Sequence, residues 1–516
     1  HRADAGCLLS VGGGQEDAWL NGCDKTAKRI GMERFSDKYQ VLKQVFGYDS
    51  FRQGQEELID SILEGRDTLG IMPTGAGKSL VYQVPALMLE GITLVISPLI
   101  SLMKDQVEGL NQAGIHAAYL NSSLTARQYY KALEFARMGR YPIIYVAPER
   151  LLTDSFLDFA LHTKISMVAV DEAHCVSQWG QDFRPSYLKI VDFINRLPKR
   201  PVVGAFTATA TKDVRDDMID ILQLQKPVVV TTGFNRENLY FGVAAPKDRY
   251  GAVRNYLATH PGDSGIIYCL TRKQVEEVCE RLRADGFSVT RYHAGLSDDE
   301  RRRNQEDFLY DRASVMVATN AFGMGIDKPN VRYVIHNNVP ESIEAYYQEA
   351  GRAGRDGDPA SCHLLWNGND FRMRRFLIDR GDAADEALDD EQRAWALQNR
   401  YRLLSQMEGY CNTTGCLREY MLRYFGDEAA AEHAVAAAAG GTADDAEGCG
   451  NCSNCLNTFE TIDITELAND LIGCILTSGM RFGVNVILDT LRGSKNEKVL
   501  RFGLDSNRYY ATHARD

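Results

Sequence analysis

A glycine-rich segment, IMPTGAGKS at 71–79, carries the clearest chemical signal of the sequence. It follows a predicted strand over 67–72 and precedes a helical stretch. Small residues let backbone N–H groups close around a β-phosphate, Lys78 can neutralise the β/γ charge, and the Ser79 hydroxyl can ligate Mg²⁺. Met72 stands where the general pattern has its first glycine, and a plain glycine-rich turn is the alternative. The segment predicts a phosphate loop whose residues are Thr74, Gly75, Ala76, Gly77, Lys78 and Ser79.

An acidic pair ends the apolar run over 165–170, which is typical of a buried strand. The run would place Asp171 at the carboxyl edge of a sheet, beside the phosphate loop, where it can hold Mg²⁺. Glu172 can then polarise the attacking water. An isolated acidic pair is usually a solvated turn. Because this pair occurs together with a phosphate loop, the sequence favours nucleotide hydrolysis.

A third segment, VFGYDSFRQGQ at 45–55, lies upstream of both motifs. Together with the phosphate loop and DEAH at 171–174, it resembles the RecQ family of superfamily 2 DNA helicases. The resemblance runs from about Phe46 to about Gly503. It implies two RecA-like lobes that close on MgATP and step along one DNA strand with 3′ to 5′ polarity, a polarity that the spacing of motifs does not itself reveal.

In that family the upstream element grips adenine. The resemblance therefore implies that Tyr48 is the stacking ring and that Arg52 and Gln55 read the base edge. The chemistry agrees, because an aromatic face with a planar fork and an amide can select a purine. The alternative is the start of a surface helix with a buried tyrosine.

The segment HCVSQWGQDFRPSY at 174–187, here called the aromatic loop, resembles the family's aromatic-rich loop that senses single-stranded DNA. Bases can stack on Trp179 and Phe183 at about 1–3 kcal/mol each, and Arg184 can meet a phosphate. Because the loop follows directly after the acidic pair, strand binding can reposition the carboxylates. Gln181 stands where many relatives have His. The alternative is that Trp179 only packs the interface between lobes.

The segment FTATAT at 206–211 matches the family motif that links hydrolysis to strand movement, through the hydroxyls of Thr207 and Thr209. The end of a Ser/Thr-rich strand would look similar in isolation.

Two further segments, VMVATNAFGMGID at 315–327 and QEAGRAGR at 348–355, match the motifs of the second lobe. Arg352 and Arg355 would share one face if their segment is helical, and their fixed forks suit a γ-phosphate across the cleft. We expect Arg355 to be the arginine finger and Arg352 to couple the motifs. Such a finger contributes about 10³- to 10⁵-fold in rate. A solvated basic face is the alternative.

Cys449, Cys452 and Cys455 supply three clustered thiolates, and tetrahedral Zn²⁺ needs a fourth ligand. Resemblance to the family's zinc module points to Cys416, although a long insertion departs from the usual spacing. Cys411 is a competing fourth ligand. Four thiolates without an open position predict a structural site. Three reduced surface cysteines are the alternative.

These motifs require elements that bring them together. Short β-branched runs alternate with helical-period segments from about Met32 to Trp366, which predicts βαβ units and parallel sheets. The cleft between two such lobes is the natural ligand site. With the resemblance, the predicted fold class is α/β: two RecA-like parallel-sheet lobes, then a helical zinc-binding module and an incomplete winged helix. The predicted domains are a flexible N-terminal extension 1–31, lobe 1 at 32–235, lobe 2 at 236–366, the zinc module at 367–460 and the start of the winged helix at 461–516.

Helices are predicted beyond lobe 2. Ala394, Leu397, Tyr401 and Leu404 are spaced as one helical face, and a second helix is expected near Cys416, with Leu417, Met421 and Tyr424 inward. Between 427 and 448 lie ten alanines, six acidic residues and no Lys or Arg. This low-complexity composition predicts an insertion that can be partly helical and is not a core. The segment RFGVNVILDTLRGSKNEKVLRFG at 481–503 resembles the opening of the family's winged helix, within which we expect the chain to stop unless it carries a reduced version.

The composition limits how the protein can bind nucleic acid and where in the cell we expect it. The net charge of -12 provides no global attraction for a polyanion, so a local groove must hold one. We find no apolar run long enough for a membrane span and no signal-peptide core, so we expect an intracellular protein, in the cytoplasm or nucleoid if bacterial and in the nucleus if eukaryotic.

The resulting hypothesis is an ATP-dependent DNA helicase of repair and recombination, with ATP, Mg²⁺ and Zn²⁺ as cofactors. Single-stranded and duplex DNA are the expected substrates, with single-strand-binding or repair proteins as further partners. Two alternatives are a DEAH-type RNA helicase and a nucleic-acid annealing scaffold without turnover. The aromatic loop and QEAGRAGR argue against the first, and the intact hydrolytic residues argue against the second.

Overall fold

The computed structural model describes residues 34–180, 182–323, 328–381, 390–436, 448–457 and 463–514. The chain divides into two compact units, His1–Leu456 and Asn457–Asp516. The second unit includes the segment 461–516 in which we predicted the start of the winged helix. The predicted N-terminal extension, 1–31, lies outside the described residues.

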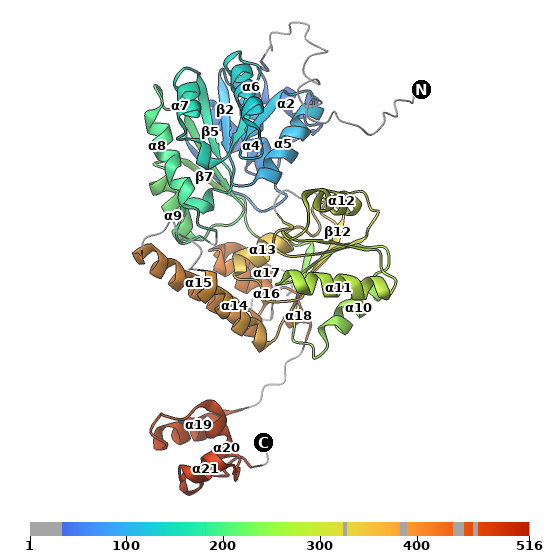
Figure 1. Ribbon diagram of the computed structural model, residues 1–516, viewed down its shortest axis with the longest axis vertical. Coiled ribbons are helices and arrows are strands. Elements are labelled where there is room, and N and C mark those ends of the chain that lie inside the picture. Colours follow the sequence, from blue (N-terminus) through green and yellow to red (C-terminus); the bar gives the residue numbers. More distant parts are fainter. Residues whose placement is uncertain are drawn as a thin grey trace. The chain divides into compact units, whose positions relative to one another are not determined.

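Lobe 1 is built on a seven-stranded sheet in the order β3-β4-β2-β5-β6-β1-β7, and every neighbouring pair is parallel. Its inner strands are buried on both faces, as their continuous apolar runs require, whereas the edge strand β7 alternates between half-buried and exposed residues. In β5, Val168 and Val170 join one hydrophobic cluster while Met167 and Ala169 join another, so helices cover both sides of the sheet (Figure 1). The strands are β1 (Thr68–Ile71), β2 (Ile92–Ile96), β3 (Ala117–Leu120), β4 (Ile143–Val146), β5 (Ile165–Val170), β6 (Val202–Thr207) and β7 (Val228–Thr231); the helices are α2 (Lys38–Gln44), α3 (Gln55–Leu63), α4 (Lys78–Met88), α5 (Ile100–Gln112), α6 (Ala126–Arg137), α7 (Asp154–Leu161), α8 (Lys189–Arg196) and α9 (Lys212–Ile221).

Lobe 2 contains a six-stranded parallel sheet in the order β10-β11-β9-β12-β13-β8. The two faces of this sheet also pack into different hydrophobic clusters: Ile266 belongs to the cluster shared with lobe 1, and Ile267 belongs to a separate cluster. The strands are β8 (Leu239–Ala244), β9 (Ser264–Tyr268), β10 (Val289–Tyr292), β11 (Val315–Ala318), β12 (Val331–His336) and β13 (Ala360–Leu365); the helices are α10 (Arg249–Thr259), α11 (Arg272–Ala284), α12 (Asp298–Leu309) and α13 (Ile343–Ala350).

The zinc module begins with α14 (Gly368–Gly381) and α15 (Asp390–Asn412), which lie side by side (Figure 1). Of the predicted face on α15, Leu404 is buried, Leu397 and Tyr401 are half-buried and Ala394 is exposed. Helices α16 (Leu417–Tyr424) and α18 (Ser453–Leu456) follow. The helix predicted near Cys416 is therefore present, with Leu417 and Met421 buried.

The predicted insertion at 427–448 needs a correction. Its first part forms helix α17 (Glu428–Ala436), which packs against α16. Ala431 is fully buried in the main cluster, and the Asp427 carboxylate accepts a hydrogen bond from Phe234 N at 3.1 Å. A helix in part of this segment agrees with the prediction, but its packing into the core does not, because an alanine-rich helix needs only a narrow contact stripe to pack. Residues 437–447 lie outside the described residues.

The second unit contains α19 (Thr465–Thr477), α20 (Val484–Leu491) and α21 (Glu497–Arg501). Cys474, Ile487 and Leu491 form its small core. Within 463–514 we find helices and turns but no strand. In the described parts of the chain, no helix combines the length and apolarity that crossing a membrane requires.

Candidate functional site

A cavity of about 490 Å³ lies at the carboxyl edge of the lobe 1 sheet and is closed on one side by lobe 2. The parallel register explains the position, because β1 ends at Ile71 opposite Thr207 and β5 ends just before Asp171. Its lining includes Tyr48, Arg52, Gln55, Gly75, Gly77, Lys78, Ser79, Asp171 and Glu172 from lobe 1, and Pro329, Arg355 and Asp356 from lobe 2. The structure therefore brings most of the predicted nucleotide residues together.

The phosphate loop turns through two glycines with left-handed backbone, Gly75 at φ 86° and Gly77 at φ 78°. Gly77 caps α4, so the helix N-terminus faces the cavity and can bind an anion. Lys78 Nζ donates to Met72 O at 3.1 Å. Burial lowers the pKa of Lys78, while Glu172 and Asp171 oppose that shift.

The predicted adenine element contacts the phosphate loop directly. Arg52 donates to Gly75 O, and Gln55 Nε2 donates to Ala76 O at 2.9 Å and to Gly77 O at 3.1 Å. Sequence reasoning missed this contact, since nothing in the spacing of the motifs indicates it. Tyr48 is half-exposed at the cavity wall, where a ring can stack on a base.

The two carboxylates differ in their surroundings. Asp171 is held by its backbone, since its N–H donates to Ile96 O at 2.9 Å and Tyr187 OH donates to its carbonyl at 2.9 Å. Burial, and secondarily Glu172, raises the pKa of Asp171 to about 7. Glu172 has a left-handed backbone at φ 48°, a conformation that is strained for a residue with a side chain.

A chain of polar contacts leads from these carboxylates to the FTATAT motif. His174 Nδ1 lies 3.4 Å from Glu172 Oε2 and 2.8 Å from Thr207 Oγ1. Thr209 N in turn donates to Thr207 Oγ1 at 3.3 Å. His174 is a link that we did not assign from sequence, although its place in the DEAH motif was the available signal.

The two predicted arginines lie in different surroundings. Helix α13 ends at Ala350, so Arg352 and Arg355 stand on turns and not on the single helical face that we considered. Arg355 lines the cavity beside the phosphate loop, with its Cγ 3.4 Å from where a Cβ on Gly75 would lie. Arg352 is buried, with Nη2 3.0 Å from the equivalent point on Gly323. Of the two, Arg355 lines the cavity and Arg352 does not.

The aromatic loop packs against helix α15. Trp179 and Trp395 meet edge to face with ring centroids 4.6 Å apart, and Asn399 Nδ2 donates to Gln178 O at 3.1 Å. Trp179 keeps 39% of its surface exposed. Phe183 is half-buried, and Gln181 lies outside the described residues.

Arg184 is paired within the aromatic loop. It forms an ion pair with Asp182 at 2.9 Å and donates to Pro98 O at 3.4 Å. A phosphate would have to compete with Asp182 for this guanidinium.

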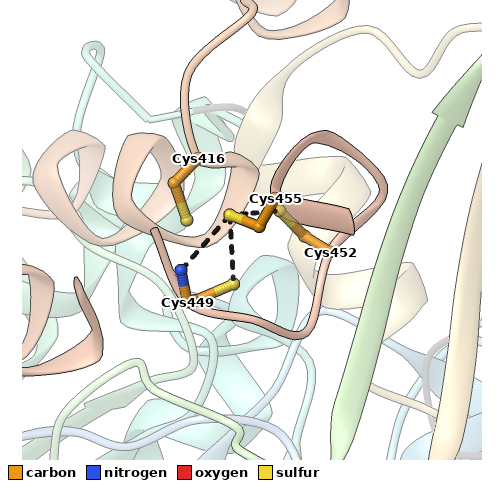
Figure 2. A group of neighbouring side chains, drawn as sticks. All are labelled: Cys416, Cys449, Cys452 and Cys455. Carbon is orange, nitrogen blue, oxygen red and sulfur yellow. Dashed lines mark hydrogen bonds between the residues drawn. The ribbon is translucent and has the colours of Figure 1, made fainter. Parts of the chain in front are cut away.

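Four cysteines form a separate group in the zinc module (Figure 2). The thiols of Cys416, Cys449, Cys452 and Cys455 all lie within 4.8 Å of one another, and Cys411 is not among them. Cys416 caps α16, and its Sγ accepts a hydrogen bond from Glu419 N at 3.4 Å. The donor set fits tetrahedral Zn²⁺ with no open position.

Contacts among the clustered thiols shift their pKa values in opposite directions. Hydrogen bonds from the Cys416 and Cys449 thiols lower the pKa of Cys452, whereas hydrogen bonds with Cys449 and Cys452 raise the pKa of Cys416. Burial instead raises the pKa of Cys411 well above its ordinary value. Position, and not acidity, therefore separates the two candidates for fourth ligand, because Cys416 lies in the group of four thiols and Cys411 does not.

Family models match four consecutive parts of the chain: DEAD/DEAH box helicase over 52–217, helicase conserved C-terminal domain over 248–357, RecQ zinc-binding over 368–456 and RQC domain over 458–515. The chain is 43% identical over 464 residues to the ATP-dependent DNA helicase RecQ of Bacillus subtilis, covering 90% of this chain and 74% of that protein. It is 42% identical over 460 residues to the ATP-dependent DNA helicase RecQ of Pasteurella multocida, covering 89% and 68%.

Among solved structures, the Mycobacterium smegmatis helicase Lhr bound to ssDNA and AMP-PNP matches 73% of this chain and 57% of its own, with a TM-score of 0.53 and 19% identity. Dbp5 of S. cerevisiae, bound to RNA and ADP BeF3, matches 72% and 98%, with a TM-score of 0.53 and 18% identity. At this identity the two structures establish the shared fold.

Proposed function

Because the chain belongs to the RecQ family of helicases, we propose that it is an ATP-dependent DNA helicase that couples MgATP hydrolysis to 3′ to 5′ translocation on single-stranded DNA and to duplex unwinding. One observation carries the proposal: the phosphate loop, the two carboxylates and Arg355 of the opposite lobe line a single cavity. The biological setting that we propose is DNA repair and recombination inside the cell, in the nucleoid or nucleus, with single-strand-binding or repair proteins as partners.

In this proposal the residues of the cavity have separate tasks. Lys78 and the N–H groups of the phosphate loop bind the β- and γ-phosphates. Ser79 and Asp171 would hold Mg²⁺, which would neutralise part of the phosphate charge. Glu172 orients the attacking water. Arg355 stabilises the charge that develops on the γ-phosphate. Hydrolysis therefore requires both lobes to be in place.

The base is bound next to this machinery. Tyr48 stacks on adenine while Arg52 and Gln55 read its edge. The contacts of Arg52 and Gln55 with carbonyls of the phosphate loop support a second task, since a base bound by these side chains would also adjust the loop.

The route from DNA to hydrolysis runs through the aromatic loop. Trp179 and Phe183 stack on bases and Arg184 meets a phosphate. Any shift of this loop moves His174, whose ring lies between Glu172 and Thr207. Thr207 and Thr209 then carry the change into the lobe 1 sheet. Arg352 couples the motifs of lobe 2 in the same cycle.

Strand-specific unwinding tests the proposal. Duplexes with a 3′ overhang, a 5′ overhang, a fork or blunt ends should be unwound with ATP only when a 3′ single strand is present. ATPase measured with single-stranded DNA or RNA separates this function from that of an RNA helicase. Unwinding that starts only from 5′ overhangs would contradict the polarity, and absence of single-turnover hydrolysis would leave an annealing scaffold as the better explanation.

A further inference from the structure

Arg236 lies in the segment 232–238, which joins the last strand of lobe 1 to the first strand of lobe 2. Its Nη1 donates to Thr74 O in the phosphate loop at 3.4 Å. Its Nη2 donates to Ala353 O at 3.1 Å and to Gly354 O at 2.8 Å. One guanidinium therefore connects the phosphate loop of lobe 1 with the backbone directly before Arg355.

The backbone around Gly354 is built to receive this contact. Gly354 has a left-handed backbone at φ 56°, and a Cβ at this position would lie 2.4 Å from Asn238 Nδ2. The same Asn238 amide donates to Gly354 O at 2.9 Å and to Asp358 O at 2.9 Å. The turn that carries Arg355 is thus fixed by two side chains of the segment between the lobes, Arg236 and Asn238.

We propose that Arg236 is a positioning residue for the arginine finger: its fork sets the distance between the phosphate loop and the turn that carries Arg355. This inference rests on the proposed function. Backbone carbonyls are the acceptors in both loops, so the fork acts by geometry and not by pairing with a carboxylate. A lysine cannot replace it, because a single ammonium at the end of a flexible stem does not span two loops as a planar fork does.

The zinc module holds the segment that carries Arg236. Arg418, two residues after Cys416, is buried and donates to Asn235 Oδ1 at 2.9 Å, to Arg236 O at 2.7 Å and to Leu239 O at 2.5 Å. Asn451, between Cys449 and Cys452, donates to Glu237 O at 3.1 Å and to Leu239 O at 3.2 Å. The zinc module therefore fixes the backbone from which Arg236 reaches the nucleotide cavity.

The test compares Arg236→Ala and Arg236→Lys with Arg254→Ala, whose arginine makes an exposed ion pair with Asp285. In the full chain, Arg236→Ala should lower kcat for DNA-stimulated ATP hydrolysis about 10- to 100-fold, since misplacing a reacting group by about 1 Å can have an effect of that size. The KM for ATP, the affinity for ADP and the zinc content should stay near wild type. Affinity for ADP with aluminium fluoride, which mimics the transition state, should fall with kcat. Arg236→Lys should remain impaired, and Arg254→Ala should behave as wild type.

Wild-type kcat in Arg236→Ala, or full recovery in Arg236→Lys, would overturn the proposal. A fall in ADP affinity equal to the fall in kcat would also overturn it, because Arg236 would then serve binding alone. Absence of DNA-stimulated hydrolysis in the wild type would instead refute the proposed function.

The role of the zinc module needs its own variant. Arg418→Ala leaves all four thiolates, so it should retain zinc and lose kcat in the same way as Arg236→Ala. If Arg418→Ala loses zinc, Asn451→Ala replaces it in the test, and we expect a smaller fall in kcat from that variant. Wild-type kcat in the variant that retains zinc would refute the link between the zinc module and the finger.

Discussion

Replacing Asp171 by Asn should stabilise the nucleotide-free protein while removing its activity. Asp171 is only 6% exposed, and its pKa is raised from 3.8 to about 7, first by burial and second by Glu172. One pKa unit corresponds to about 1.36 kcal/mol. The ionised carboxylate therefore lowers the free energy of unfolding by about 4 kcal/mol above pH 7. Asn keeps the shape without the charge, so this destabilisation disappears.

The raised pKa also predicts how the difference in stability between the variant and the wild type changes with pH. Because the pKa is raised in the folded state, the destabilisation is absent below about pH 4, grows between about pH 4 and 7, and is complete above that range. In EDTA at pH 8, thermal unfolding of lobe 1 should shift upward in Asp171→Asn by about 8–16 °C, at about 2–4 °C per kcal/mol for a lobe of this size. The exposed Asp220→Asn is the matched control. Addition of Mg²⁺ to the ADP-bound protein should stabilise the wild type more than the variant, because Asp171 is the proposed Mg²⁺ ligand. A variant no more stable than wild type at pH 8, or a difference that persists at pH 4, would refute the reasoning.

Three further outcomes follow from the site. Glu172→Gln should abolish ATP turnover but keep MgATP binding, and near-wild-type hydrolysis would contradict its assignment as the group that orients water. Replacing Trp179 and Phe183 by Ala should leave basal ATPase nearly unchanged and remove its stimulation by single-stranded DNA; stimulation that survives would exclude the aromatic loop as the sensor. Cys416→Ala should lose zinc and expose the helices of the zinc module to protease, whereas Cys411→Ala should keep one zinc per chain by metal analysis, and the reverse pattern would overturn the ligand set.

The α/β architecture and the nucleotide cavity could be predicted because their signals are local. A run such as 165–170 is apolar at every position, which only a strand buried on both faces requires. The acidic pair after that run must then lie at the carboxyl edge, next to a phosphate loop that follows its own strand. Strand type and chain direction are enough to bring these residues together.

Contacts between distant segments could not be predicted in this way. Helix α17 belongs to the core because Ala431 packs into the main cluster, and composition does not encode that partner. The helical face considered for Arg352 and Arg355 failed because Gly351 ends α13 before either residue. Arg236 carries no motif spacing of its own, and its role depends on carbonyls 117 and 118 residues away in the chain.

The zinc module contacts two segments to which we assign roles in catalysis: the segment that carries Arg236 and the aromatic loop. Through Arg418 it holds the segment that carries Arg236 and hence the turn of Arg355. Through α15 it contacts the aromatic loop, where Asn399 holds the Gln178 carbonyl and Trp395 meets Trp179. A base that stacks on Trp179 must share the ring's exposed surface or displace Trp395. If DNA stacks on Trp179 as we propose, its binding changes a contact with the same module that, in our proposal, positions Arg355, and a structural zinc site is suited to this task because metal binding stabilises the fold of that module.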